Sequence, residues 1–150
     1  MVTLTPSQKG AAAEAAIAAA AIRARLVVLR PLCEGGRYDL VFDTGSHLLR
    51  VQCKWATLQG GVLMVMCRTS RHTPGGYVRT TYAADEIDAL GAYVAETGDC
   101  YLIPAAEVAG RTMLSLRIAP ARNGQSRKIR WAHEYELTRS LRQNWGVPVA

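Results

Sequence analysis

The sequence predicts a mixed α/β fold, in which helices flank a central mixed β-sheet. An alanine-rich stretch near the start has the composition of a helix, several short β-branched runs follow it, and turn residues separate these runs. The chain has 150 residues, of which 49% are hydrophobic and 20% are charged. These values favour one compact domain over residues 1–150 and exclude a disordered or low-complexity chain.

The first helix has the clearest signals. Thr5 or Ser7 is suited to cap it, and Pro6 is suited to its first turn. Ala11–Ala24 consists almost entirely of strong helix formers, with Glu14 as its only acidic residue. The small alanine side chains allow another part of the backbone to approach this helix closely.

A series of strands and turns follows the helix. Asp43 opens the tight turn Thr44–Ser46, so the strands on either side of it are expected to pair antiparallel. The expected strands are Leu26–Leu29, Tyr38–Asp43, Leu48–Lys54, Val62–Arg68, a short edge strand Tyr77–Tyr82, Cys100–Ile103 and Met113–Ile118. Residues 69–76 are expected to form a polar loop. The remaining predicted elements are a helix over Asp85–Ala95, a helical turn Ala105–Val108, a turn at Asn123-Gly124 and a terminal helix Glu134–Gln143.

The net charge of +6 is confined to one end of the chain. Residues 1–110 contain ten Lys and Arg against ten Asp and Glu, whereas residues 111–150 contain eight against two. A one-sided basic segment is typical of a surface that contacts nucleic acid, and the alternative is a merely solvated face.

The cysteines and the apolar runs indicate a cytoplasmic protein without a membrane span. Cys33, Cys53, Cys67 and Cys100 show no metal-binding or redox spacing, which favours free thiols in a reducing compartment. The apolar run Ala15–Ile22 is too short to cross a bilayer. We therefore expect no membrane partner, and nothing in the sequence points to an organic cofactor.

Polar residues converge on the hairpin predicted around the turn Thr44–Ser46. Alternation along Leu48–Lys54 puts Arg50, Gln52 and Lys54 on one face of the strand. Asp39 lies at the start of the neighbouring strand. The hairpin therefore brings an Asp, a Gln and a Lys to one edge of the sheet.

This pattern resembles the PD-(D/E)XK nucleases, in which an Asp at a strand start is followed, one hairpin later, by Glu-any-Lys. Within that superfamily the chain is most similar to the small intron-encoded homing endonucleases, over about residues 7–136. The stretches that carry the resemblance are Lys9-Gly10 with Glu14, Arg37–Val41, Val51–Lys54, Tyr82–Asp88, Tyr101–Pro104, and Arg117 with Asn123–Gln125 and Ile129–Ala132. The resemblance implies a restriction-endonuclease-like core.

The chain departs from the family pattern at two positions. Tyr38 precedes Asp39 where the family name has Pro, and Gln52 stands where it has an acid. Modification-dependent restriction nucleases also resemble this D…QxK form. Gln52 removes one negative charge from the site, which makes Glu14 more important.

The resemblance implies a Mg²⁺ site, with Mn²⁺ as a substitute, since Mg²⁺ prefers oxygen ligands. Asp39 is expected to supply the principal carboxylate, Gln52 an amide oxygen and Cys53 its backbone carbonyl, because the Cys53 side chain points into the core. Glu14 is expected to bind a water on the metal or a second metal. Lys54 is expected to orient the attacking water or to stabilise the developing phosphorane charge.

Each of these residues also has an ordinary structural interpretation. Asp39 is alternatively a solvated acid at a strand end, and Lys54 a charge that protects a sheet edge. Gln52 is alternatively a hydrogen-bonded core residue, and Glu14 a solubilising acid on the helix. His47, His72 and His133 share no ligand spacing, so none of them is expected to be catalytic.

Two basic segments are the expected contacts with double-stranded DNA. The first carries Arg68, Arg71, His72 and Arg79, and the second carries Arg122, Asn123, Gln125, Arg127, Lys128 and Arg130. A domain of this size reads a long site only when it is repeated, so a homodimer or a homotetramer is expected.

The leading functional hypothesis is a Mg²⁺-dependent, sequence-specific double-strand DNA endonuclease of the homing type. The alternatives are a nuclease resembling Holliday-junction resolvases or restriction enzymes, and a DNA-binding protein whose nuclease site has decayed.

Overall fold

A five-stranded mixed sheet forms the centre of the computed structural model, which describes residues 2–149 except for the side chains of Arg71 and His72. The strand order is β1-β2-β3-β8-β9, and β3 and β8 are parallel whereas the other neighbours are antiparallel. The strands are β1 (Val27–Leu29), β2 (Leu40–Asp43), β3 (Leu48–Trp55), β8 (Ala89–Val94) and β9 (Asp99–Pro104). The predicted fold class is confirmed.

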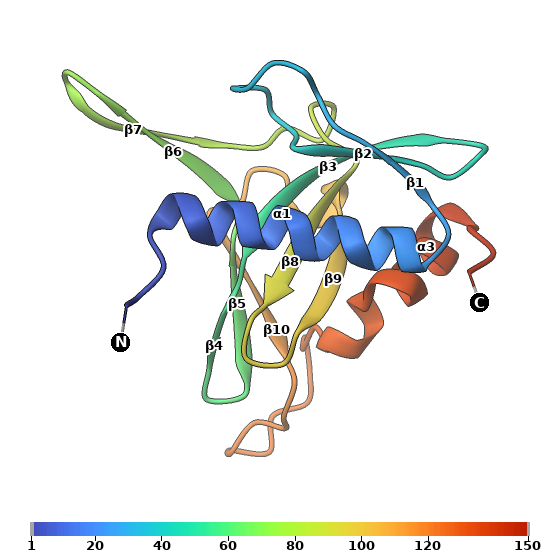
Figure 1. The fold of residues 1–150 in the computed structure, drawn as a ribbon. Helices are drawn as coiled ribbons and strands as arrows, with labels where there is room; N and C mark the ends of the chain where they lie inside the picture. Colours follow the sequence, from blue (N-terminus) through green and yellow to red (C-terminus); the bar gives the residue numbers. More distant parts are fainter. Residues whose placement is uncertain (1, 150) are drawn as a thin grey trace.

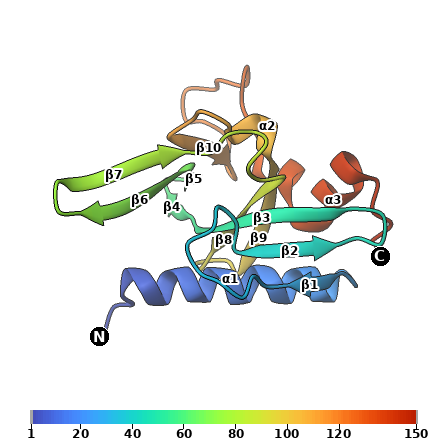
Figure 2. The same cartoon turned by 90° about the horizontal axis from the view of Figure 1, so that it is seen from above.

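Helix α1 (Pro6–Arg23) crosses one face of this sheet, as Figures 1 and 2 show. On the other side lie helix α2 (Ala105–Val108) and a three-stranded sheet of order β10-β5-β4 (Figure 2). The strands of this second sheet are β4 (Thr57–Gln59), β5 (Val62–Met66) and β10 (Met113–Arg117). The central sheet is therefore covered on both faces, with one hydrophobic cluster on each side.

The start of α1 is capped by Thr5, one of the two residues that the sequence predicts for this role. The Thr5 side chain accepts a hydrogen bond from the Gln8 backbone amide, and the Gln8 side chain accepts one from the Thr5 amide. This capping box satisfies two of the amides that a helix start leaves unpaired. Ala13, Ile17 and Ala21 are buried, and α1 packs against the central sheet along this face.

Two sequence predictions are wrong. The segment Asp85–Ala95, expected to be a helix, contains strand β8 in the middle of the sheet. It is buried on both faces, so its short apolar run carries no alternation that distinguishes a strand from a buried helix. A Cβ at Gly91 would meet Ile17 at 3.2 Å, so this glycine allows α1 to pack closely on the sheet.

The second wrong prediction is the polar loop over residues 69–76. This segment is most of a hairpin formed by β6 (Arg68–Thr73) and β7 (Gly76–Thr81), which make a sheet of their own. The predicted edge strand Tyr77–Tyr82 is β7 itself. Polarity misled the prediction, because a ribbon that projects from the molecule buries little and carries polar residues on both sides. The short strand β4 was not predicted either.

The C-terminal part is close to the prediction. A 3₁₀ turn, η1 (Ala132–Tyr135), precedes helix α3 (Leu137–Trp145), and the Glu136 carboxylate accepts hydrogen bonds from the amides of Thr138 and Arg139. Gly146 ends the helix in the left-handed conformation. None of the helices within residues 2–149 is long and apolar enough to cross a membrane.

Candidate active site

Asp39 is fixed at the point where β2 begins beside β3. Its backbone amide donates to the carbonyl of Val51 at 2.9 Å, so Val51 faces both Asp39 and its own register partner, Leu40. Its carboxylate oxygen Oδ2 accepts a hydrogen bond of 2.9 Å from the backbone amide of Cys53. The carboxylate therefore lies over the middle of the sequence Gln52-Cys53-Lys54.

Glu14 reaches the same place from helix α1. Burial and the neighbouring charge of Asp39 raise the pKa of Glu14, while Arg30 opposes the increase. Arg30 is the described ion-pair partner of Glu14, with 3.3 Å between Nη2 and Oε2. The structure thus brings together two carboxylates that lie 25 positions apart in the sequence, and their charges are only partly balanced.

A cavity of about 420 Å³ opens beside these two acids. The segment that connects β1 to β2 forms most of its wall, and Glu14 and Asp39 line it directly. Its polar lining and its open mouth give solvent and ions access to both carboxylates. The cavity does not extend to the side chain of Lys54.

Gln52 and Cys53 are neighbours on β3 that carry neutral oxygen donors, and the Gln52 side chain lies on the same face of the strand as Lys54. Gln52 is 8% exposed, and no hydrogen bond holds its side-chain amide among the described residues. The Cys53 side chain packs into the cluster under α1, and its burial raises the pKa of the thiol. Because the amide and the carbonyl of one strand residue point to the same side, the Cys53 carbonyl lies on the side of Asp39.

Lys54 is mostly buried on the opposite side of β3 from α1. Its ammonium nitrogen Nζ donates to the carbonyl of Arg68 at 2.9 Å and lies 5.5 Å from the centre of the Tyr82 ring. Burial lowers the pKa of Lys54, and the nearby charge of Asp39 opposes this shift. The lysine is therefore held close to Asp39 while it contacts the base of the β6–β7 hairpin.

The donor set fits a hard divalent cation. Two close carboxylates, one unpaired amide oxygen and a backbone carbonyl are all oxygen donors, which are the ligands that Mg²⁺ and Mn²⁺ accept. A cation here would also neutralise the two acids that share this edge. Among residues 2–149 no cluster of three or more His, Cys, Asp or Glu side chains has the arrangement of a metal site, so the neutral donors are essential to such a site.

The first basic segment lies on the projecting hairpin (Figures 1 and 2). Arg79 is exposed on β7, and Arg68 is half-buried at the base of β6. Arg71 and His72 also belong to β6, but their side chains lie outside the described part of the chain.

The second basic segment forms a loop between β10 and η1. The exposed residues of this loop include Arg122, Asn123, Gln125, Arg127 and Lys128. Arg130 differs from them, because its Nε donates to the Glu107 carboxylate at 3.2 Å and the Tyr135 hydroxyl donates to the same oxygen at 2.6 Å. Arg130 therefore anchors the end of the loop to α2.

Sequence reasoning did not assign roles to Arg37, Arg30 or Tyr82. Arg37 forms an ion pair with Glu86 and lies 4.5 Å from the centre of the Tyr82 ring. Arg30 balances Glu14. Their contacts join segments far apart in the chain, and only the position of Arg37 two residues before Asp39 offered a sequence signal.

Comparison with known proteins supports a nuclease. The family described as PD-(D/E)XK endonuclease matches residues 4–138. The solved structure of a bacterial homing endonuclease, I-Ssp6803I, aligns with a TM-score of 0.77 and 27% identity, over 95% of this chain and 96% of that chain. The structure of MepB, at 19% identity, covers 79% of this chain and 81% of that chain with a TM-score of 0.37. No curated protein matches the sequence.

Proposed function

The chain belongs to the PD-(D/E)XK endonuclease family and is a DNA endonuclease, and we propose that it is a Mg²⁺-dependent enzyme of the homing type, which cuts both strands of DNA at a specific sequence. The observation that carries the proposal is the meeting of Asp39 and Glu14 with the Gln52-Cys53-Lys54 stretch of β3. The likeness to I-Ssp6803I over almost the full length of both chains supports the homing type.

The cation would be held by Asp39, Glu14, Gln52 and the carbonyl of Cys53. A divalent cation in this site supplies a positive charge that polarises the phosphate and lowers the pKa of a bound water. Asp39 is preorganised for this task, because the Cys53 amide fixes its oxygen Oδ2 over β3. Gln52 brings no charge, so Glu14 supplies the second negative charge of the site.

Lys54 would act on the reacting phosphate or on the attacking water. As an ammonium it donates up to three hydrogen bonds, of which the Arg68 carbonyl accepts one. Its remaining donors form no hydrogen bond with the described residues, and they would stabilise the negative charge that develops on the phosphorane. Partial burial strengthens this interaction, because water screens it less.

The two basic segments would bind the DNA. A two-stranded ribbon is one of the shapes that the major groove admits, and β6–β7 carries Arg68 and Arg79 on such a ribbon. The exposed loop with Arg122, Arg127 and Lys128 is suited to phosphates. We further propose a homodimer or a homotetramer, because two copies supply one active site for each strand. Free buried cysteines are consistent with a cytoplasmic protein.

Cleavage of a plasmid library tests this function. Supercoiled plasmids with random genomic inserts are incubated with the protein and Mg²⁺, and the ends of linear products are sequenced. The proposal predicts ends that share one long site, and none in chelator. Scattered ends would reject sequence specificity. Cutting of four-way junctions alone would favour the resolvase-like alternative, and failure of any metal ion to stabilise the protein would favour a decayed site.

A further inference from the structure

Contacts at its base determine the direction in which the β6–β7 hairpin projects from the protein. Its two strands form a separate sheet and pair only with each other, from Arg68↔Thr81 to Thr73↔Gly76. Figures 1 and 2 show it extending away from the rest of the molecule. An isolated two-stranded ribbon is marginally stable in water, so contacts at its base must fix its orientation.

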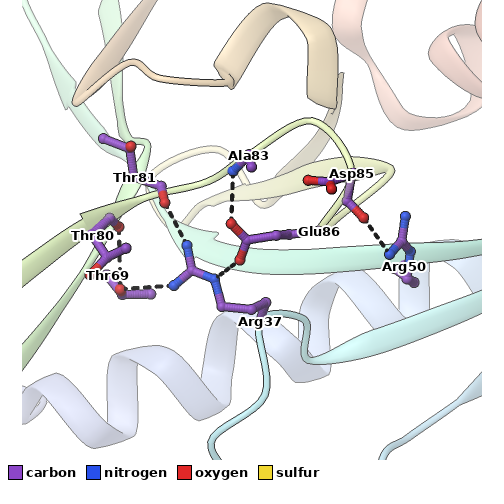
Figure 3. Close-up of polar contacts among 8 residues, drawn as sticks. All are labelled: Arg37, Arg50, Thr69, Thr80, Thr81, Ala83, Asp85 and Glu86. Atoms are coloured by element: carbon purple, nitrogen blue, oxygen red, sulfur yellow. Dashed lines mark hydrogen bonds and ion pairs between the residues drawn. The ribbon is translucent and has the colours of Figure 1, made fainter.

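Arg37 makes such contacts with both strands of the hairpin (Figure 3). Its Nη1 donates to the Thr69 hydroxyl on β6 at 3.2 Å, and its Nη2 donates to the Thr81 carbonyl on β7 at 2.6 Å. Its Nε is paired with the carboxylate of Glu86, in the segment through which the chain leaves the hairpin. One guanidinium therefore joins both strands and their exit.

Glu86 is itself fixed. Its other carboxylate oxygen accepts a hydrogen bond of 3.1 Å from the Ala83 amide, which with Arg37 lowers the pKa of Glu86. The Tyr82 ring lies beneath both Arg37 and Lys54, at 4.5 Å and 5.5 Å from their cationic groups. The base of the hairpin is thus tied to two cations, one of which is the proposed catalytic lysine.

The position of Arg37 in the chain connects this cluster to the metal site. Arg37 lies two residues before Asp39, and Lys54 lies directly after Cys53, whose amide holds Asp39. The Lys54 ammonium also donates to the carbonyl of Arg68, the first residue of the hairpin. A shift of the hairpin base would therefore move both Lys54 and the segment that leads to Asp39.

Resting on the proposed function, we propose that Arg37 is a positioning residue that sets the direction of a DNA-reading hairpin relative to the cutting site. The hairpin reads the target, and Arg37 determines which phosphate then lies at Lys54. The guanidinium uses Nε, Nη1 and Nη2 on protein acceptors and is only 28% exposed, so it is directed toward the protein rather than toward a phosphate.

The test compares Arg37→Gln and Arg37→Lys with a matched control, Arg50→Gln. Arg50 is also half-buried and also joins a carboxylate, that of Asp88, and a carbonyl, that of Asp85. Figure 3 shows the contact with Asp85. Among the described residues Arg50 has no hydrogen bond or ion pair with the hairpin. Measurements are DNA affinity without Mg²⁺, the single-turnover cleavage rate at saturating protein, the position of the cut, and hydrogen exchange of the hairpin amides.

For Arg37→Gln we expect DNA affinity close to that of the wild type, a cleavage rate lower on the order of 10²-fold, and cuts spread over neighbouring phosphates. Arg37→Lys keeps the charge without the planar fork and should not restore a single cut position. Arg50→Gln should cut at one position, with a rate within about twofold of wild type.

A single cut position and a normal rate for Arg37→Gln would overturn the proposal. So would weaker DNA binding with a salt slope reduced by about one, which identifies a phosphate contact. Equal losses for the Arg37 and Arg50 variants would show a general structural role. If the wild-type protein does not cut DNA, the proposed function fails, and unchanged hairpin exchange in Arg37→Gln would then refute the anchoring itself.

Discussion

The backbone amide of Cys53 donates a hydrogen bond of 2.9 Å to the carboxylate of Asp39, across the β2–β3 hairpin. This contact holds the acid over the strand that carries Gln52 and Lys54. Glu14 approaches from α1, and its raised pKa reflects burial and the charge of Asp39. Preorganised donors of this kind are the basis of electrostatic catalysis.

Lys54→Ala should abolish cutting and leave DNA affinity almost unchanged. The ammonium is partly buried and faces the reacting group in the proposed mechanism, so its loss should lower the single-turnover rate by about 10²-fold or more. DNA affinity is measured by titration without Mg²⁺. A parallel loss of binding would make Lys54 a phosphate anchor and its proposed role wrong.

Glu14→Gln should raise the thermal stability of the metal-free protein at neutral pH. The pKa of Glu14 is raised in the folded state, so the native state binds more protons than the unfolded state. The free energy of unfolding therefore falls as the pH rises from the ordinary pKa of Glu, 4.5, through the higher pKa of the folded state. An amide removes this unfavourable ionisation. Melting curves in chelator measure the effect across this pH range.

The same substitution should weaken stabilisation by Mg²⁺ or Mn²⁺, because the cation loses a carboxylate ligand. Glu34→Gln is the control, since Glu34 lines the same cavity but contributes little to the pKa of Glu14. If the Glu14 variant gains as much stability from metal as the wild type, Glu14 is not a ligand.

On the alkaline side, kcat/KM should fall with an apparent pKa below the ordinary lysine pKa of 10.5. Burial lowers the pKa of Lys54, so this group loses its proton at a lower pH than an exposed lysine. A cationic role then requires activity to fall as pH rises through that lowered pKa. Lys54→Arg should keep some activity and extend the plateau to higher pH. Activity that instead increases through this range would indicate a neutral lysine acting as a base.

Neutralising Arg122, Arg127 and Lys128 should weaken DNA binding and flatten its salt dependence. Each lost phosphate contact lowers the slope of log K against log salt by about 0.9. The control is a variant in which the same number of charges is removed at Arg23, Arg25 and Arg142. These residues lie near the C-terminal ends of α1 and α3. Equal slopes for the two variants would move the DNA surface away from the loop. Arg130→Ala should act mainly on stability, because Arg130 pairs with Glu107.

Local signals predicted the parts of the fold that local chemistry controls. The cap at Thr5 and the turn after Asp43 are examples, since the Asp43 carboxylate accepts a hydrogen bond from the Gly45 amide at 2.8 Å. The strand β8 was mistaken for a helix because its burial on both faces depends on α1 and on the second sheet. No local pattern encodes those neighbours.

The candidate site likewise has parts that local sequence patterns predict and parts that they do not. The β2–β3 hairpin, beside which Asp39 and Gln52 lie, follows from alternation and turn length, and the family resemblance supplied Glu14. The contacts of Arg37 with Thr69, Thr81 and Glu86 join positions 32 to 49 residues apart, so no local pattern in the sequence predicts them.

The proposed cleavage site is tested most directly by single-turnover cleavage of the recovered target DNA by the wild type and by Asp39→Asn, with Mg²⁺ and with chelator. The substitution keeps the size of the side chain and an oxygen that accepts from the Cys53 amide, but it removes the charge that holds a cation. We expect the wild type to cut with Mg²⁺ and not with chelator, and Asp39→Asn not to cut at equal DNA occupancy. Cleavage by Asp39→Asn at the wild-type rate would contradict this expectation.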